Sequence, residues 1–172
     1  MEVYFDPLGQ DEPPRGSVLS IGNFDGVHIG HQAVLRQVVS RGAELRTTAM
    51  ALTLEPHPVK LLRPDQAPRL VTTLQQRLQL IERTGIGATL VVPFTRGFAA
   101  TSAESFVREV LVGRLGVREV YIGANFRFGH RAAGTVEMLR ELAAGRFEVE
   151  GSTLARYGDE ETCSTLIREA LA

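Results

Sequence analysis

Residues 18–31 carry the strongest pattern in the sequence and read Val18-Leu19-Ser20-Ile21-Gly22-Asn23-Phe24-Asp25-Gly26-Val27-His28-Ile29-Gly30-His31. The apolar run Val18–Ile21 predicts a short buried strand that is closed by Gly22. Residues 31–40 then place apolar side chains on one face of a predicted helix, which Gly42 is expected to end. The stretch therefore predicts a strand–loop–helix unit with a loop rich in glycine and histidine.

The alternation of strand and helix continues along the chain. Further strands are expected at residues 47–54, 89–92, 119–122 and 147–149, and further helices at residues 74–81, 106–111, 135–144 and 164–171. Thr101 and Glu104 are expected to form a capping box for the helix that carries Phe106. Residues 55–69 contain four prolines, too many for a helix or a central strand, and are expected to form a functional loop.

This order predicts an α/β fold with a mostly parallel, doubly wound sheet and a single domain over residues 1–172. Ligands of such sheets bind at the carboxyl ends of the strands. Three loops with chemically interesting side chains are expected at that edge, namely residues 22–31, 123–134 and 162–168.

Composition narrows the class of protein. The 172 residues are 44% hydrophobic and 23% charged, which fits one globular domain. Nineteen basic and twenty acidic residues give a formal charge of −1, so no general attraction to nucleic acid or to an anionic membrane is expected. The single cysteine, Cys163, excludes a disulfide within the chain and fits a reducing cytoplasm. We therefore expect a cytoplasmic protein without nucleic-acid or membrane partners.

Two common nucleotide-binding motifs are absent from the sequence. The only lysine, Lys60, does not follow a glycine-rich loop, which excludes a Walker P-loop. No Gly-x-Gly-x-x-Gly occurs, which disfavours dinucleotide binding of the usual kind. A phosphate site in this chain must therefore be built differently.

The loop after the first strand has the features of an anion site. Gly22, Gly26 and Gly30 allow the backbone to turn tightly and to approach a bulky ligand. His28 and His31 are three residues apart at the start of a helix, so both rings project from one side at the positive end of the helix dipole. Together with backbone N–H groups they predict a site for a phosphate chain. Two alternatives are a pair of polar helix-start residues and metal ligation, although helical metal pairs prefer a spacing of four. No protein metal ligands are predicted.

His28-Ile29-Gly30-His31 matches the phosphate-binding signature of the nucleotidyltransferase superfamily and of class I aminoacyl-tRNA synthetases. The chain is too short for a synthetase and, with one lysine, lacks the synthetases' second signature. The longer string from Gly22 to His31 resembles the start of the FMN adenylyltransferase module of bacterial riboflavin kinase/FAD synthetase. Three further motifs follow in that family's order: Glu55-Pro56-His57-Pro58, Gly123-Ala124-Asn125-Phe126-Arg127-Phe128-Gly129 and Ser164-Thr165-Leu166-Ile167-Arg168.

The chain departs from the family pattern at a few positions. Leu54 stands where the flap motif usually has phenylalanine, Cys163 where the last signature usually has serine, and Asn125 where many members have aspartate. The family continues into a riboflavin kinase β-barrel that is absent from these 172 residues. We therefore expect either a stand-alone transferase or a module of a longer parent protein with a kinase domain.

The resemblance implies a Rossmann-like fold and the reaction FMN + ATP → FAD + pyrophosphate, with Mg²⁺ entering with ATP. It assigns nucleotide binding to Gly22, Asn23, Phe24, Asp25, Gly26, His28, Gly30, His31, Ser164, Thr165 and Arg168. Within this set, the catalytic residues are His28, His31, Ser164, Thr165 and Arg168. It assigns flavin binding to Pro56, His57, Pro58, Asn125, Phe126, Arg127 and Phe128.

Alternative roles remain open for several of these residues. Ser164 and Thr165 fit a helix N-cap equally well, with Arg168 as a surface charge. Asp25 is a candidate for fixing the turn through backbone hydrogen bonds. His57 fits a purely structural loop residue, and one of the two loop phenylalanines is expected to pack inward while the other lines the flavin slot.

Two other functions also remain open. One is a nucleotidyltransferase for another phosphorylated acceptor, such as pantetheine phosphate or nicotinamide mononucleotide. The other is a nucleotide- or flavin-binding module without catalysis.

Overall fold

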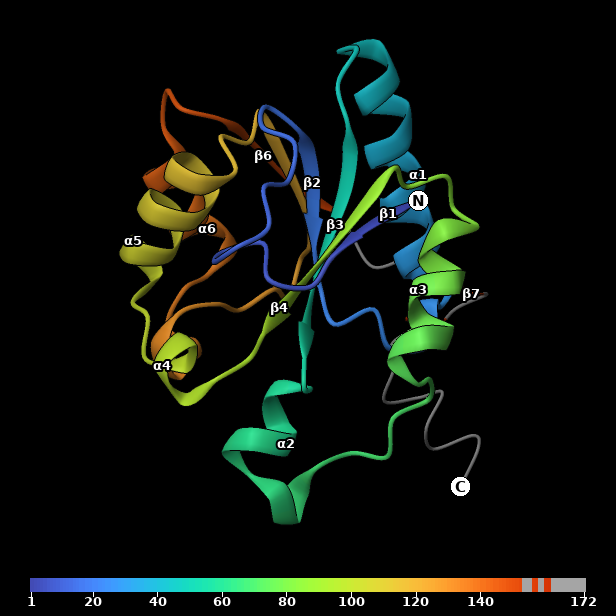
Figure 1. The fold of residues 1–172 in the computed structure, drawn as a ribbon, viewed down its shortest axis with the longest axis vertical. Helices are drawn as coiled ribbons and strands as arrows, with labels where there is room; N and C mark the ends of the chain where they lie inside the picture. The colour runs from blue at the N-terminus through green and yellow to red at the C-terminus, as the bar shows by residue number, and fades with distance from the viewer. Residues whose placement is uncertain (153–155, 158–159, 162–172) are drawn as a thin grey trace.

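The structure is a computed structural model that describes residues 1–152, 156–157 and 160–161 (Figure 1). Six strands form one sheet in the order β1-β4-β3-β2-β5-β6, and every neighbouring pair is parallel. The strands are β1 (Glu2–Tyr4), β2 (Val18–Ile21), β3 (Ala49–Glu55), β4 (Ala88–Pro93), β5 (Glu119–Gly123) and β6 (Glu148–Ser152). The predicted parallel α/β fold is confirmed.

Helices cover both faces of the sheet, which Figure 1 shows nearly edge-on. One face is covered by α1 (Ile29–Glu44) and α3 (Leu74–Glu82). The other is covered by α5 (Ala103–Ser105), which continues into the π-helix η3 (Phe106–Arg114), and by α6 (Val136–Ala143). The short elements are α2 (Pro58–Leu62), α4 (Arg96–Ala99) and the 3-10 turns η1 (Asp25–Val27), η2 (Pro64–Gln66) and η4 (His130–Ala132).

The sheet divides the core into two clusters. Because side chains alternate along a strand, Leu19 of β2 packs with Leu111 and Leu139 of the η3–α6 side. Its neighbour Val18 packs with Leu35 of α1 and with other residues of the α1–α3 side. Burial on both faces explains why the strands read as continuous apolar runs in the sequence.

Two predicted helix boundaries are wrong. Gly42 lies inside α1 and does not end it: a Cβ at this position would come within 3.1 Å of the Thr47 carbonyl oxygen, so the glycine permits close packing of the helix on the next segment. The predicted capping box at Thr101 and Glu104 is also wrong. Ser102 is the N-cap of α5 and accepts a hydrogen bond from the Ser105 backbone N–H at 3.1 Å.

The proline-rich segment 55–69 contains helical turns that were not predicted. Pro58 and Pro64 occupy the first turns of α2 and η2, where a missing backbone N–H costs nothing. Glu55 is the last residue of the central strand β3, and the rest of the segment contains no strand, as predicted. The segment continues directly from β3 and lies beyond the end of the sheet, at the bottom of Figure 1.

Three short strands were missed. β1 has three residues and pairs with β4, more than 80 positions away, so local periodicity does not reveal it. β7 (Arg156–Tyr157) and β8 (Glu160–Glu161) form a separate antiparallel pair. The helix predicted at 164–171 lies outside the described residues. Among the residues that the structure describes, no helix has the length and apolar character needed to span a membrane.

Candidate active site

Three loops leave neighbouring strands at the same edge of the sheet. β2 lies between β3 and β5, and all three run parallel. The loops that follow them are residues 22–28, residues 56–57 with α2, and residues 124–134. The topology therefore gathers these three loops at one edge. We call residues 22–28 the histidine loop, residues 55–58 the flap and residues 123–129 the flavin-side loop. The third predicted loop, 162–168, lies outside the described residues, as do Ser164, Thr165 and Arg168.

The two histidines at the start of α1 stack on each other. His28 is the N-cap residue, and its Nδ1 accepts a long hydrogen bond of 3.4 Å from the backbone N–H of His31. The ring centroids are 3.7 Å apart and the ring planes differ by 24°. Both rings thus lie together at the helix N-terminus, as their spacing predicts, where backbone N–H groups and the helix dipole favour an anion.

Burial favours the uncharged form of both histidines. Burial lowers the pKa of His28 from its ordinary value, although Asp25 acts in the opposite direction. Burial, and then the neighbouring His28, lower the pKa of His31 to about 3. Because Nδ1 of His28 accepts a hydrogen bond, the hydrogen of its neutral ring is assigned to Nε2. The pair therefore offers N–H donors to a phosphate rather than two fixed positive charges.

Phe24 lies beneath the histidines in the core. Its side chain is 2% exposed, and its ring meets that of His31 edge-on, with centroids 5.3 Å apart. A Cβ at Gly22 would lie 3.2 Å from the Phe24 ring, so a side chain there would press on the ring. Phe24 supports the His31 ring from inside, whereas the resemblance places it among the nucleotide-binding residues.

Asp25 is committed to a neighbouring segment. Its buried carboxylate accepts hydrogen bonds from the backbone N–H groups of Val71 and Thr72 and from the Thr72 hydroxyl, at 3.0 to 3.2 Å. Gly26, with φ +77°, makes the turn and donates its own N–H to the Thr72 hydroxyl. The backbone bonds expected of Asp25 exist, but they fix the segment before α3 instead of the turn itself.

The flap residues are ordered by local bonds. The Glu55–Pro56 peptide bond is cis. His57 is 7% exposed and caps α2, with its Nδ1 accepting from the Val59 backbone N–H at 3.3 Å. Pro58 occupies the first turn of α2. The structural interpretation of His57 therefore accounts for its position.

The predicted flavin-side loop presents one aromatic ring inward. Phe128 is buried in the core and Phe126 is half-buried, and their rings stack with centroids 5.7 Å apart. Asn125 and Arg127 are exposed. The backbones of Phe128 and Gly134 exchange two hydrogen bonds that close the loop. Of the two aromatic side chains, Phe126 is the one available to a ligand.

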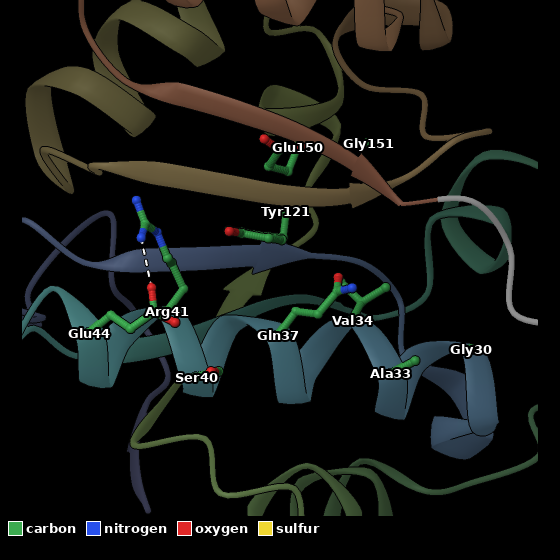
Figure 2. Close-up of a pocket in the computed structure, with 10 residues that line it drawn as sticks. All are labelled: Gly30, Ala33, Val34, Gln37, Ser40, Arg41, Glu44, Tyr121, Glu150 and Gly151. Atoms are coloured by element: carbon green, nitrogen blue, oxygen red, sulfur yellow. Dashed lines mark hydrogen bonds and ion pairs between the residues drawn. The ribbon is translucent and has the colours of Figure 1, made fainter.

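A groove of about 540 Å³ extends from this edge along α1 (Figure 2). It begins at Gly30, between the two histidines in sequence, and runs to Glu44. Tyr121 of β5 and Glu150 of β6 line its other wall. Arg41 stands at the far end, bonded to Glu44 and to the buried carboxylate of Glu119 at 2.7 to 2.9 Å. The sequence did not predict this groove, because its lining residues come from three separate elements.

Sequence reasoning also missed Arg77, which the structure buries completely beside the flap. One signal was available. Arg77 falls in the apolar helical spacing of Leu74, Leu78 and Ile81, so a charged residue was placed on the inward face of a predicted helix.

The structure thus defines a parallel α/β protein whose candidate site begins with two stacked histidines at the start of α1. The family model for FAD synthetase matches residues 10–166, and the chain belongs to this family.

Curated relatives agree with this assignment. The chain is 35% identical over 161 residues to the bifunctional riboflavin kinase/FMN adenylyltransferase of Escherichia coli strain K12, covering 93% of this chain and 51% of that protein. It is 36% identical over 160 residues to the protein of the same name from Haemophilus influenzae, covering 92% and 52%. The chain thus spans about half the length of these relatives.

A solved structure shares the fold. The crystal structure of a macrolide-efflux protein from Streptococcus pneumoniae superposes with a TM-score of 0.85 at 22% identity, over 99% of this chain and 56% of that one. At this identity the likeness supports the fold alone.

Proposed function

We propose that this chain transfers AMP from Mg-ATP to FMN and yields FAD and pyrophosphate. The observation that carries the proposal is the stacked pair of His28 and His31 at the N-terminus of α1 in a member of the FAD synthetase family. The names of the curated relatives include the same transferase activity.

The chemistry needs positioning more than acid–base catalysis. An oxygen of the FMN phosphate attacks the α-phosphorus of ATP. The bond between the α-phosphorus and the oxygen that bridges the α- and β-phosphates breaks, and pyrophosphate leaves. Because a phosphate monoester is largely ionised near pH 7, the attack requires no general base. The difficulty lies in bringing two polyanions together and in the charge that builds on the pyrophosphate. Preorganised donors that meet this charge lower the barrier.

The histidine pair supplies such donors. The Nε2–H of His28 and the ring of His31 lie at the helix N-terminus, where the dipole adds to their effect. A phosphate at this position would raise the pKa of both rings, because a nearby negative charge favours the protonated form. We propose that Gly22, Asn23, Gly26 and Gly30 shape the backbone around the same phosphates.

Magnesium enters with ATP as part of the substrate. Among the described residues no group of three or more His, Cys, Asp or Glu side chains gathers in one place that could hold a metal ion. The Asp25 carboxylate already accepts hydrogen bonds from three donor groups of Val71 and Thr72. We propose that the ATP phosphates and water hold most of the Mg²⁺ coordination sphere.

The acceptor would bind between the flap and the loop after β5. We propose Phe126, Asn125 and Arg127 as contacts to FMN and Pro56, His57 and Pro58 as the flap that covers it. Ser164, Thr165 and Arg168 remain proposed as the second phosphate clamp on the strength of the sequence motif alone.

Two further points belong to the proposal. The relatives' names include riboflavin kinase, and we assign to residues 1–172, taken as one domain, the transferase step only; a kinase domain in a longer parent protein would supply FMN. We also propose a cytoplasmic location, which the single cysteine supports.

The decisive experiment mixes the purified chain with Mg-ATP and FMN and measures FAD and pyrophosphate. Pantetheine phosphate and nicotinamide mononucleotide serve as alternative acceptors, and riboflavin with Mg-ATP should give no phosphorylation. FAD formation in preference to the other dinucleotides is expected. Binding of both substrates without pyrophosphate release would show a non-catalytic module instead.

A further inference from the structure

Arg77 is a guanidinium buried completely at the edge of the sheet that carries the loops. It projects from α3, and its side chain has no exposed surface. Its Nη1 donates to the Thr53 hydroxyl at 3.2 Å and to the Leu54 carbonyl at 3.4 Å. These two acceptors lie near the carboxyl end of β3, immediately before the flap.

The same guanidinium reaches the first residue before the cis proline. Nη2 lies 3.5 Å from the Glu55 carboxylate, close enough for an ion pair. Glu55 precedes Pro56, and its backbone carbonyl accepts from the Phe94 N–H at 2.8 Å. The base of the flap is therefore held in two ways: by the ion pair between Arg77 and Glu55, and by backbone hydrogen bonds with the neighbouring strand.

Thr53 extends this contact to the histidine loop. While its oxygen accepts from Arg77, its hydroxyl hydrogen is donated to the Asn23 carbonyl at 3.1 Å. Asn23 belongs to the loop that leads from β2 to His28. A continuous chain of contacts thus runs from the flap through Glu55, Arg77 and Thr53 to the histidine loop.

Stability does not explain this arrangement. Within the described part of the chain, Nε and Nη2 of Arg77 and Oε2 of Glu55 are buried without a hydrogen-bond partner. Burying an incompletely bonded ion pair is costly, and apolar replacements of such pairs are often neutral or stabilising. A side chain that is expensive to bury and poorly satisfied indicates a role other than holding the fold.

We infer that Arg77 is a positioning residue that fixes the position of the flap relative to the histidine loop. It thereby fixes the position of the FMN phosphate relative to the α-phosphorus of ATP. The inference rests on the proposed function for its substrates, but the coupling of the two loops is a property of the chain itself. Arg77 acts through Glu55 and Thr53 and is not proposed to touch either substrate.

The test replaces Arg77 with methionine, which has similar length without charge or donors. We expect kcat to fall by about tenfold to a hundredfold, because misplacing reacting groups by about 1 Å can cost about a hundredfold. The Kd for Mg-ATP alone should change less than about twofold. The melting temperature should fall, because removing one partner leaves the buried Oε2 of Glu55 unpaired, so kcat is compared well below the melting temperatures of both proteins. Arg77→Lys should recover part of kcat, since an ammonium can keep the ion pair with Glu55 but lacks the fork that also reaches Thr53.

A double-mutant cycle tests the path. Thr53→Val removes the hydroxyl with little change in shape. If Arg77 acts through Thr53, the double variant should be no slower than the worse single variant. Arg83→Met, the same substitution at an exposed arginine after the end of α3, is the matched control and should leave kcat within about twofold of the unaltered chain.

Amide hydrogen exchange measures the coupling between the flap and the histidine loop without an assay of enzyme activity. In Arg77→Met, exchange should rise at residues 22–28 and at 55–59 together, while β4 and α6 stay protected as in the Arg83→Met control. This outcome supports the coupling even if the unaltered chain makes no FAD, a result that would overturn only the proposed function. Unchanged exchange in both segments, or a kcat equal to that of the unaltered chain at a temperature where both proteins are fully folded, would overturn the inference.

Discussion

His28 uses its two ring nitrogens for different tasks. Nδ1 caps α1 by accepting from the His31 N–H, and the hydrogen on Nε2 is available to a phosphate. A substitution can separate the two tasks, because asparagine is also a good N-cap residue.

We predict that His28→Asn lowers kcat by about a hundredfold to a thousandfold, the effect typical of losing one preorganised donor. Its free energy of unfolding should stay close to that of the unaltered chain. His28→Ala should lose the same activity and also about 1 kcal/mol of stability with the cap. Steady-state kinetics and urea unfolding measure the two effects, and full activity in His28→Asn would contradict the assigned role.

His31 makes stability depend on pH. Its folded pKa of about 3 lies below the ordinary value of 6.5, so between these values the unfolded chain binds a proton that the folded chain does not. Stability is therefore unaffected by His31 above pH 6.5 and falls as the pH drops toward 3.

Between pH 7.5 and pH 5 this loss should be about 1 to 2 kcal/mol. His31→Gln cannot titrate, and its free energy of unfolding should decline less over the same interval by that amount. Urea unfolding at both pH values measures the difference. Parallel curves for the two proteins would show that the His31 ring is not held neutral by the fold.

For single residues, the sequence predicts which side chains form the candidate site better than it predicts what packs around them. The histidine spacing and the helix start were sufficient to place both rings together. The neutral state of the pair, the burial of Phe24 and the partners of Asp25 depend on segments distant in sequence, such as Val71 and Thr72, and could not be inferred from the loop alone.

Among the elements, the loop after β5 is fixed to α5 at one glycine. Gly129 has φ +73°, and a Cβ at this position would lie 2.7 Å from the Ala103 backbone nitrogen. Neither the conformation nor the contact tolerates a side chain.

We predict that Gly129→Ala destabilises the protein by about 1 to 3 kcal/mol and displaces the loop that carries Phe126. Gly123→Ala is the matched control, because a Cβ at Gly123 meets nothing within 4 Å. Thermal unfolding of the two variants should differ clearly. Equal melting temperatures would show that the loop can move away from α5 without loss.

Element boundaries illustrate why local rules fail in particular places. Proline at the first turn of α2 is compatible with a helix, so counting prolines in 55–69 was misleading. Glycine often ends helices, but Gly42 lies within α1 and allows the helix to pack closely against the segment before β3. The strand and helix order itself was predictable, because buried parallel strands read as continuous apolar runs.

For the molecule as a whole, ligand binding and folding are linked. If Mg-ATP binds the folded chain alone, a concentration of about 100 times Kd stabilises it by about 2.7 kcal/mol. We predict this shift in urea unfolding with Mg-ATP, a smaller shift for His28→Asn at the same concentration, and none with MgCl₂ alone. An equal shift for the unaltered chain and His28→Asn would place ATP elsewhere.

The order of strands has a consequence for how the molecule is made. β1 occupies residues 2–4, yet its neighbour in the sheet is β4 at residues 88–93. On the ribosome, β1 therefore leaves the exit tunnel before its partner β4, which is synthesised nearly ninety residues later. The central pair β2–β3 has both of its members available much earlier, so β1 can join the sheet only after β2, β3 and β4 have been made, although it precedes all three in the chain.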